Sequence, residues 1–122
     1  MERALGLGGI FFKARDPQAL AVWYERHLGV PLEAGQTYGT FTSHAAGEHT
    51  VWSTFPESTR YFEPSTAPFM LNYRVRDLDA MLDQLRAAGA AVEDRVEEYE
   101  YGRFGWAMDP EGNRFELWEP RS

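Results

Sequence analysis

The sequence contains no cysteine. Disulfide bonds, thiolate zinc sites, iron–sulfur clusters and cysteine nucleophiles are therefore all excluded. Basic residues are also scarce, because twelve Lys and Arg stand against nineteen Asp and Glu, which gives a net charge of −7. Nucleic-acid phosphates and anionic membranes attract basic patches, so we expect neither nucleic acid nor a membrane as a partner.

Long apolar runs are missing as well. No stretch approaches the roughly 18 apolar residues of a membrane-spanning helix, and the opening MERALGLGG lacks the features of a signal peptide. We therefore expect a cytoplasmic protein. The 122 residues, of which 43% are hydrophobic and 25% charged, suit one globular domain over residues 1–122. The aromatic share of 15% is high, so these rings should line a core or a pocket.

The stretch from Trp106 to Pro120 predicts a β-hairpin. Asp109-Pro110-Glu111-Gly112 has the composition of a type I turn, with proline in the second position and glycine in the fourth. In the strand after the turn, Phe115 and Leu117 point to one side. The other side carries a guanidinium, a carboxylate and an indole, from Arg114, Glu116 and Trp118. This mixture suits the wall of a cavity better than a packed core or an open surface.

The chain contains one strand–helix unit twice. In the first half, an apolar run precedes a helix pattern that begins at Asp16 and stops at Gly29. In the second half, another apolar run precedes a helix pattern that begins at Asp77 and stops at Gly89. Aspartate is a favoured N-cap, and glycine is a favoured helix stop. The two starts are 61 positions apart, which is half of the 122 residues.

Each half then continues with three short strands. The sequence Tyr38-Gly39-Thr40-Phe41 returns as Tyr101-Gly102-Arg103-Phe104. We therefore predict an α+β domain of two modules, about residues 6–56 and 69–120, each with one sheet face under its helix. The opposite faces should curve around a shared cleft. Residues 57–68 are rich in proline, serine and threonine, which predicts a linker.

These patterns resemble the glyoxalase/bleomycin-resistance/dioxygenase superfamily, also called the vicinal oxygen chelate superfamily. The resemblance extends over roughly residues 6–120, and its most specific part is Asp109-Pro110-Glu111-Gly112-Asn113 followed by Phe115-Glu116-Leu117. It implies paired βαβββ modules that form a cupped, open-barrel mixed sheet with the helices outside, and it implies a homodimer. In enzymes of this superfamily, the cup holds a divalent metal whose ligands come from the first and last strands of each module.

The four metal-ligand positions that the resemblance implies are occupied here by Gly9, Trp52, Met70 and Glu116. Glycine has no side chain, an indole only donates, and a thioether suits soft ions such as Cu(I). One carboxylate does not make a site for zinc, magnesium, manganese or iron. We therefore predict a degenerate metal site with no metal ligands and no cofactor, and a divalent metal is the alternative.

Seven side chains are expected to face the cup and to form a ligand site. They are Phe11, Trp52, Met70, Asn72, Arg74, Glu116 and Trp118. Glu116 has two interpretations: it is a catalytic general base whose pKa is raised by burial, or it is a carboxylate paired with Arg114 or Arg74. Arg74 either clamps a carboxylate or phosphate oxygen or forms a salt bridge to Glu116.

The other aromatic and charged candidates have two interpretations each. Trp52 and Trp118 either stack on an aromatic or cationic ligand or fill the space of the cup. Trp23 and Tyr24 are assigned to the core. A metal group of His44, Glu48 and His49 is a minor alternative, and the acidic residues at positions 97, 98 and 100 predict a solvated strand edge.

Three functions follow from these predictions. The first is a metal-independent, glyoxalase-like protein that binds a small organic molecule. The second is an enzyme of the superfamily, either lyase-like or dioxygenase-like or metal-free with Glu116 as the base. The third is a drug-binding resistance protein of the bleomycin-resistance type, for which the acidic charge suits a cationic drug.

Overall fold

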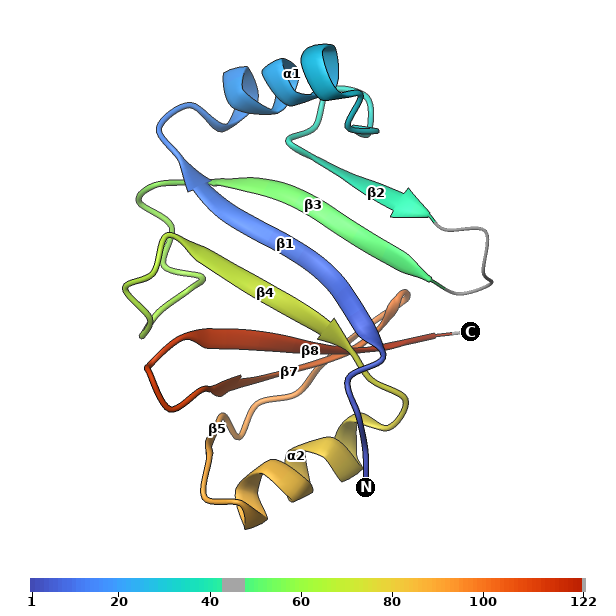
Figure 1. The fold of residues 1–122 in the computed structure, drawn as a ribbon, viewed down its shortest axis with the longest axis vertical. Helices are drawn as coiled ribbons and strands as arrows, with labels where there is room; N and C mark the ends of the chain where they lie inside the picture. The colour runs from blue at the N-terminus through green and yellow to red at the C-terminus, as the bar shows by residue number, and fades with distance from the viewer. Residues whose placement is uncertain (43–47, 122) are drawn as a thin grey trace.

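The computed structural model describes residues 1–42 and 48–121. Within these residues, one mixed sheet of eight strands lies between two helices, α1 (Pro17–Leu28) and α2 (Leu78–Ala87) (Figure 1). The strands are β1 (Gly6–Ala14), β2 (Tyr38–Thr42), β3 (His49–Pro56), β4 (Phe69–Arg74), β5 (Ala91–Val92), β6 (Glu97–Tyr99), β7 (Gly102–Met108) and β8 (Arg114–Pro120).

The strand order shows the duplication directly. The order is β2-β3-β1-β4-β8-β7-β5, and β6 also pairs with β7. β1 runs parallel to β3, as β4 runs parallel to β8, and the antiparallel pair β1–β4 joins the two halves. The predicted α+β fold of two modules is confirmed. The sequence predicts three strands after each helix, but among its described residues the first module has only β2 and β3 after α1. An isolated β-bridge between Leu32 and Gly39 takes the place of the third strand.

The helices begin and end as the sequence predicts. The carboxylates of Asp16 and Asp77 accept hydrogen bonds of 3.0 Å from the backbone N–H groups of Ala19 and Ala80. Gly29 closes α1 with a left-handed φ of 68°, a conformation that glycine adopts at little cost. In the described part of the chain, no helix is long and apolar enough to cross a membrane.

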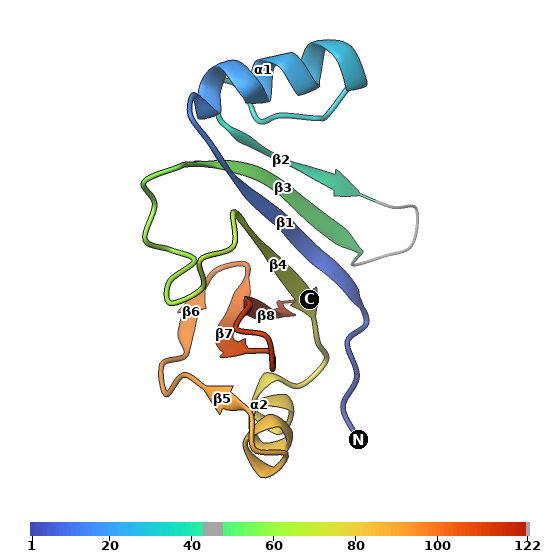
Figure 2. The same cartoon turned by 60° about the vertical axis from the view of Figure 1, so that its left-hand side comes forward.

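Each helix covers one half of the sheet from outside, so the inner faces of the two halves are left to a common cup (Figures 1 and 2). Beneath α2, the buried cluster contains Val75, Leu78, Met81, Leu82 and Leu117. Beneath α1, it contains Ala21, Val30 and Trp52. A third cluster lies inside the cup and contains Phe11, Phe62, Met70 and Trp106.

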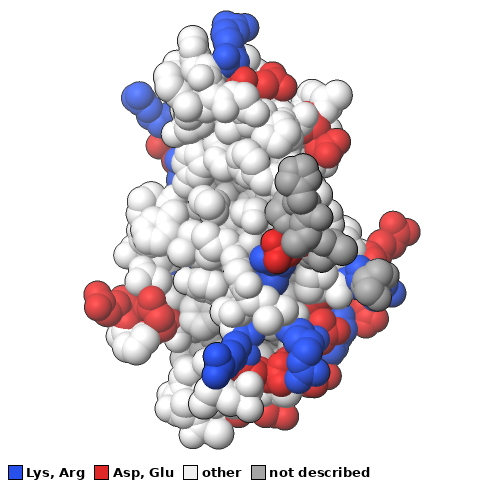
Figure 3. Space-filling model, turned by 45° about the vertical axis from the view of Figure 1, so that its right-hand side comes forward, with Lys and Arg blue, Asp and Glu red and all other residues white. Residues whose placement is uncertain are grey.

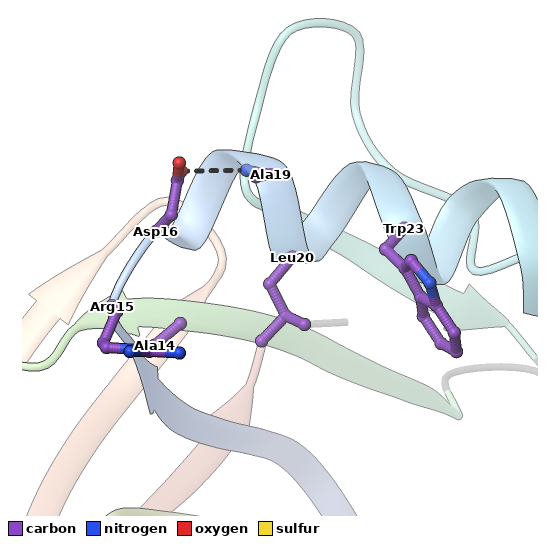
Figure 4. A pocket seen from close by; sticks show the side chains of 6 residues that line it. All are labelled: Ala14, Arg15, Asp16, Ala19, Leu20 and Trp23. Carbon is purple, nitrogen blue, oxygen red and sulfur yellow. Dashed lines mark hydrogen bonds between the residues drawn. The ribbon is translucent and has the colours of Figure 1, made fainter.

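Helix α1 carries a large exposed ring. Tyr24 packs against the core beneath α1, as predicted, but Trp23 is 51% exposed, so its assignment to the core is wrong. Figure 4 shows Trp23 and Leu20 along a shallow hollow on this helix. Asp16, at one end of this hollow, caps helix α1 by accepting a hydrogen bond from the backbone N–H of Ala19.

Candidate functional site

Glu116 is the centre of the inner face of the cup. Its side chain is buried, and three protein groups donate hydrogen bonds to it. The amide Nδ2 of Asn72 lies 2.6 Å from Oε1, and the indole Nε1 of Trp106 lies 2.9 Å from Oε2. The hydroxyl of Tyr61 also donates to Oε2. The carboxylate therefore meets most of its hydrogen-bonding capacity within the protein.

The register of the sheet positions two of these donors. Glu116 on β8 stands opposite Asn72 on β4 and opposite Trp106 on β7. The turn before β8 fixes this register, because Asp109 accepts 2.9 Å hydrogen bonds from the backbone N–H groups of Glu111 and Asn113. The predicted turn and the predicted inward direction of Glu116 are both confirmed.

The third donor comes from residues 57–68, between β3 and β4. The ring of Tyr61 stacks on Phe55 with centroids 5.7 Å apart, and Phe62 is 0% exposed. Sequence reasoning treated this segment as a linker and missed its part in the site. The available signal was a pair of adjacent aromatic residues within an otherwise polar segment.

The predicted ion pairs of Glu116 do not form. Arg114 instead pairs with Glu93, with Nε–Oε2 and Nη2–Oε1 distances of 2.7 and 2.9 Å. Its guanidinium also donates to the carbonyl of Tyr61. The side chain of Arg74 makes no hydrogen bond or ion pair within the described residues, and its Nε is buried. The negative charge of Glu116 is therefore met by neutral donors and not by a paired cation.

Trp52 faces away from the cup, so its prediction as a ligand-site wall is wrong. It packs beneath α1 against Phe12 and Tyr24, with ring centroids 5.3 and 5.1 Å away. Its neighbours Val51 and Ser53 face the cleft instead. Successive side chains of a strand point to opposite faces, so a placement that is wrong by one residue exchanges the faces.

The inner face of the sheet lines a cleft that is open to solvent and has a volume of about 750 Å³. The cup is therefore not filled by tryptophan, although Trp118 forms part of its wall. The cleft has aromatic walls from both modules and from residues 57–68. The aromatic residues that line it include Tyr38, Tyr61, Tyr99, Tyr101, Phe104 and Trp118. Figure 3 shows that the middle of one face of the molecule is largely uncharged, whereas acidic and basic side chains gather over its lower part.

The structure brings together most of the predicted site residues. Phe11, Asn72, Glu116 and Trp118 line the cleft, and the fully buried Met70 supports it from behind. Arg74 is buried beside Gly8 and is not among the lining residues. The stretch predicted as a solvated acidic edge also lines the cleft, through Glu97, Tyr99 and Tyr101. No local pattern marks these residues, because β6 reaches the cleft only by pairing with β7.

Burial perturbs the pKa values of the two interacting acids. Removal from water raises the pKa of Glu116 above its ordinary value of 4.5, although the hydrogen bonds from Tyr61, Asn72 and Trp106 oppose this effect. Burial also raises the pKa of Tyr61, and the nearby charge of Glu116 adds to the rise. Tyr61 therefore stays a protonated hydrogen-bond donor at neutral pH.

The raised pKa of Glu116 predicts a pH-dependent stability. Because the folded state favours the protonated carboxyl, the stabilisation is fully present below the ordinary value of 4.5 and is lost as pH rises through the folded pKa. We expect the Glu116→Gln variant, which stays neutral, to gain unfolding free energy relative to the parent protein as pH rises. Urea denaturation of both proteins between about pH 4 and pH 8 measures this difference.

Glu98→Gln serves as the matched control, since the Glu98 side chain is 61% exposed and its loss removes the same charge. A difference between Glu116→Gln and the parent protein that is constant over this pH range would contradict the prediction.

The residues around Glu116 do not fit a divalent metal. The three donors point N–H and O–H hydrogens at the carboxylate, and a cation there would meet these hydrogens instead of lone pairs. Among the described residues, no three His, Cys, Asp or Glu side chains gather as a metal group. Of the suggested histidine group, His49 interacts with Thr42 at 3.3 Å, and His44 lies outside the described residues.

The duplicated sheet around an internal cleft has the architecture of the cupped α+β class that the motifs predicted. A family model described as a glyoxalase-like domain matches residues 9–118. The chain therefore belongs to the glyoxalase-like domain family. A comparison with curated proteins found no match.

Several solved structures share this fold. Methylmalonyl-CoA epimerase from Mycobacterium tuberculosis has a TM-score of 0.70 and 22% identity, covering 98% of this chain and 90% of that one. A variant of the Streptomyces coelicolor epimerase, in complex with 2-nitronate-propionyl-CoA, has a TM-score of 0.75 and 15% identity over 98% and 100% of the two chains. A superfamily member from Vibrio splendidus 12B01 has a TM-score of 0.60 and 14% identity over 98% and 99%.

Proposed function

We propose that this protein binds a small organic molecule with a flat aromatic part in the cleft beside Glu116, without a metal. The observation that carries the proposal is the set of three protein donors on Glu116. They occupy the one carboxylate available at the superfamily's metal position. The cleft next to it is open and has a volume of about 750 Å³, within the range of small-molecule sites.

The walls of the cleft support an aromatic ligand. Phe104 and Trp118 are stacked, with centroids 5.9 Å apart and an angle of 6° between their planes. Tyr99 and Tyr101 are stacked at 5.4 Å and 9°. Ordered ring pairs of this kind offer flat, apolar surfaces at a low cost in side-chain entropy. A structural relative in complex with 2-nitronate-propionyl-CoA shows that this fold accommodates an organic ligand.

Glu116 supplies a polar contact under this proposal. Oε2 accepts two hydrogen bonds and Oε1 accepts one, so Oε1 retains one lone pair for a donor on the ligand. A role of Glu116 as a general base stays a prediction. Binding of a cationic drug and dimer formation stay predictions as well.

The neutral probe indole tests this proposal in the presence of EDTA. We expect binding with a dissociation constant of roughly 1 mM or tighter, about −4 kcal/mol. In NMR spectra of labelled protein, the indole N–H signal of Trp118 should move, because Trp118 lines the cleft. The signal of the exposed Trp23 on α1 is the internal control and should not move.

Elemental analysis after dialysis against zinc and manganese completes the test. The expected result is no stoichiometric metal. Loss of indole binding in EDTA would overturn the metal-independent proposal, and so would about one metal ion per chain that disappears in Glu116→Ala.

A further inference from the structure

We propose that Arg74 binds a carboxylate of the ligand, so that the cleft selects aromatic carboxylic acids over neutral or cationic aromatic molecules. This inference rests on the proposed function, since it assigns the chemical class of the molecule in the same cleft. Arg74 stands opposite Trp118 in the β4–β8 register. A carboxylate at Arg74 therefore places an attached ring beside the Trp118 wall.

Within residues 1–42 and 48–121, Arg74 is a buried cation whose side chain has no partner. Only 9% of the residue is exposed, and its Nε is buried with no hydrogen-bond partner. No hydrogen bond or ion pair joins its side chain to another group in the described part of the chain. The other buried charged side chains are satisfied, because Arg114 pairs with Glu93 and Glu116 accepts three hydrogen bonds. Buried charges without partners are rare, since desolvation makes them costly.

A second unsatisfied group lies two residues away on the same face of β4. Asn72 is 1% exposed, and its Oδ1 is buried without a partner among the residues that the structure describes. The carboxylate of Glu116 fixes the orientation of this amide, because Nδ2 donates to it over 2.6 Å and Oδ1 is therefore turned away. A carboxylate would satisfy the unpartnered Nε of Arg74, whereas Oδ1 of Asn72 needs a hydrogen-bond donor and would be satisfied by an N–H or O–H elsewhere on the ligand.

The glycines of β1 leave room for these two side chains. A Cβ on Gly8 would overlap Asn72 Oδ1 and would lie 3.0 Å from Arg74 Cγ. A Cβ on Gly6 would overlap the Nη2 atom of Arg74. The Arg74 side chain therefore lies beside Gly6 and Gly8, which have no side chains of their own. Arg74 is not among the residues that line the cleft, but its neighbours Gly8 and Trp118 are.

Nearby charges do not neutralise Arg74. Among the charged residues of the cleft wall, Glu97 pairs with Arg95 at 3.0 Å and Arg121 pairs with Glu98 at 3.5 Å. The planar fork of a guanidinium matches a carboxylate with two parallel hydrogen bonds, which strongly favours this ligand group over a neutral one.

Three related probes test the proposal: indole-3-acetate, indole-3-acetamide and tryptamine, which share one ring and differ in charge. We expect the acetate to bind at least tenfold more tightly than the acetamide, and tryptamine to bind least. Isothermal titration calorimetry gives the affinities. In Arg74→Met, the affinities for acetate and acetamide should agree within about twofold. Arg76→Met is the matched control, because its side chain is 71% exposed, and the preference should persist there.

Thermal unfolding without ligand adds an independent readout. Because Arg74 is an unpaired buried charge, Arg74→Met should raise the melting temperature by roughly 3 °C. A fall of the same size would show that the guanidinium stabilises the fold, and it would overturn the proposal. Two results together distinguish a binding role of Arg74 from a structural one. They are the preference of the parent protein for indole-3-acetate and the gain in stability when Arg74 is replaced by methionine.

The outcomes separate this inference from the proposed function. If acetate and acetamide bind equally, or if Arg74→Met keeps the preference for acetate, the carboxylate inference is overturned while indole binding still supports the aromatic cleft. If indole and all three probes fail to bind, the proposed function and the inference both fall.

Discussion

Replacing Phe62 with alanine should lower the free energy of unfolding by about 4 kcal/mol. Phe62 is 0% exposed, although it lies between β3 and β4 in a segment with the composition of a linker. Its ring packs among Phe11, Met70 and Trp106 inside the cup. Removal of the ring leaves a cavity at the centre of this cluster, and urea denaturation measures the cost.

Phe69→Ala is the control for this experiment, because the side chain of Phe69 is 44% exposed at the start of β4. We expect it to cost about 1 kcal/mol or less. Equal effects of the two substitutions would show that residues 57–68 do not contribute a core residue. The comparison also tests the site, since the rings of Phe62 and Tyr61 are in contact, with centroids 6.4 Å apart, and Tyr61 donates to Glu116.

Among the substitutions considered, Gly8→Ala should weaken ligand binding the most. In Gly8→Ala, the new Cβ would overlap Asn72 Oδ1 and would lie 2.9 Å from Cε3 of Trp118. Asn72 has little freedom to move, because its amide is tied to Glu116. We therefore expect a loss of roughly 2 kcal/mol in unfolding free energy, the range of overpacked sites. Binding of indole-3-acetate should fall below detection in calorimetry, because the side chains that form this end of the cleft are displaced.

Gly105→Ala is the matched control on the other face of the sheet. Its Cβ would meet two methyl groups of Leu82 at 3.2 Å, which small shifts relieve. We expect unchanged binding and a stability change under about 1 kcal/mol. Full binding by Gly8→Ala would contradict the proposed position of the ligand.

The fold was predictable because its signals are local. Asp16 and Gly29 mark the ends of one helix within a few residues of chain, and Asp77 marks the start of the other. The Asp109 turn is encoded by its own side chain and by a glycine. The recurrence of these signals about 61 residues apart was sufficient to predict two similar modules.

The site was predictable only in part. The alternation along β8 placed Glu116 and Trp118 on the inner face, because side-chain direction in a strand has a period of two. The same reasoning failed for Trp52, since its loop has a different length from the corresponding loop and the strand shifted by one residue. The ion pair between Arg74 and Glu116 was also wrong, because Asn72, and not Arg74, stands opposite Glu116 in the β4–β8 register and donates to the carboxylate.

The sequence by itself determined two capped helices, a closing hairpin, the duplicated architecture and a carboxylate, that of Glu116, on the inner face of β8. Only the tertiary structure decided which groups surround that carboxylate. Tyr61 reaches Glu116 across 55 positions of the chain, and Asn72 reaches it across 44. Such contacts depend on strand register and on how residues 57–68 fold into the cup, and no local pattern of residues encodes either. The unpartnered state of Arg74 is likewise a property of the assembled cup.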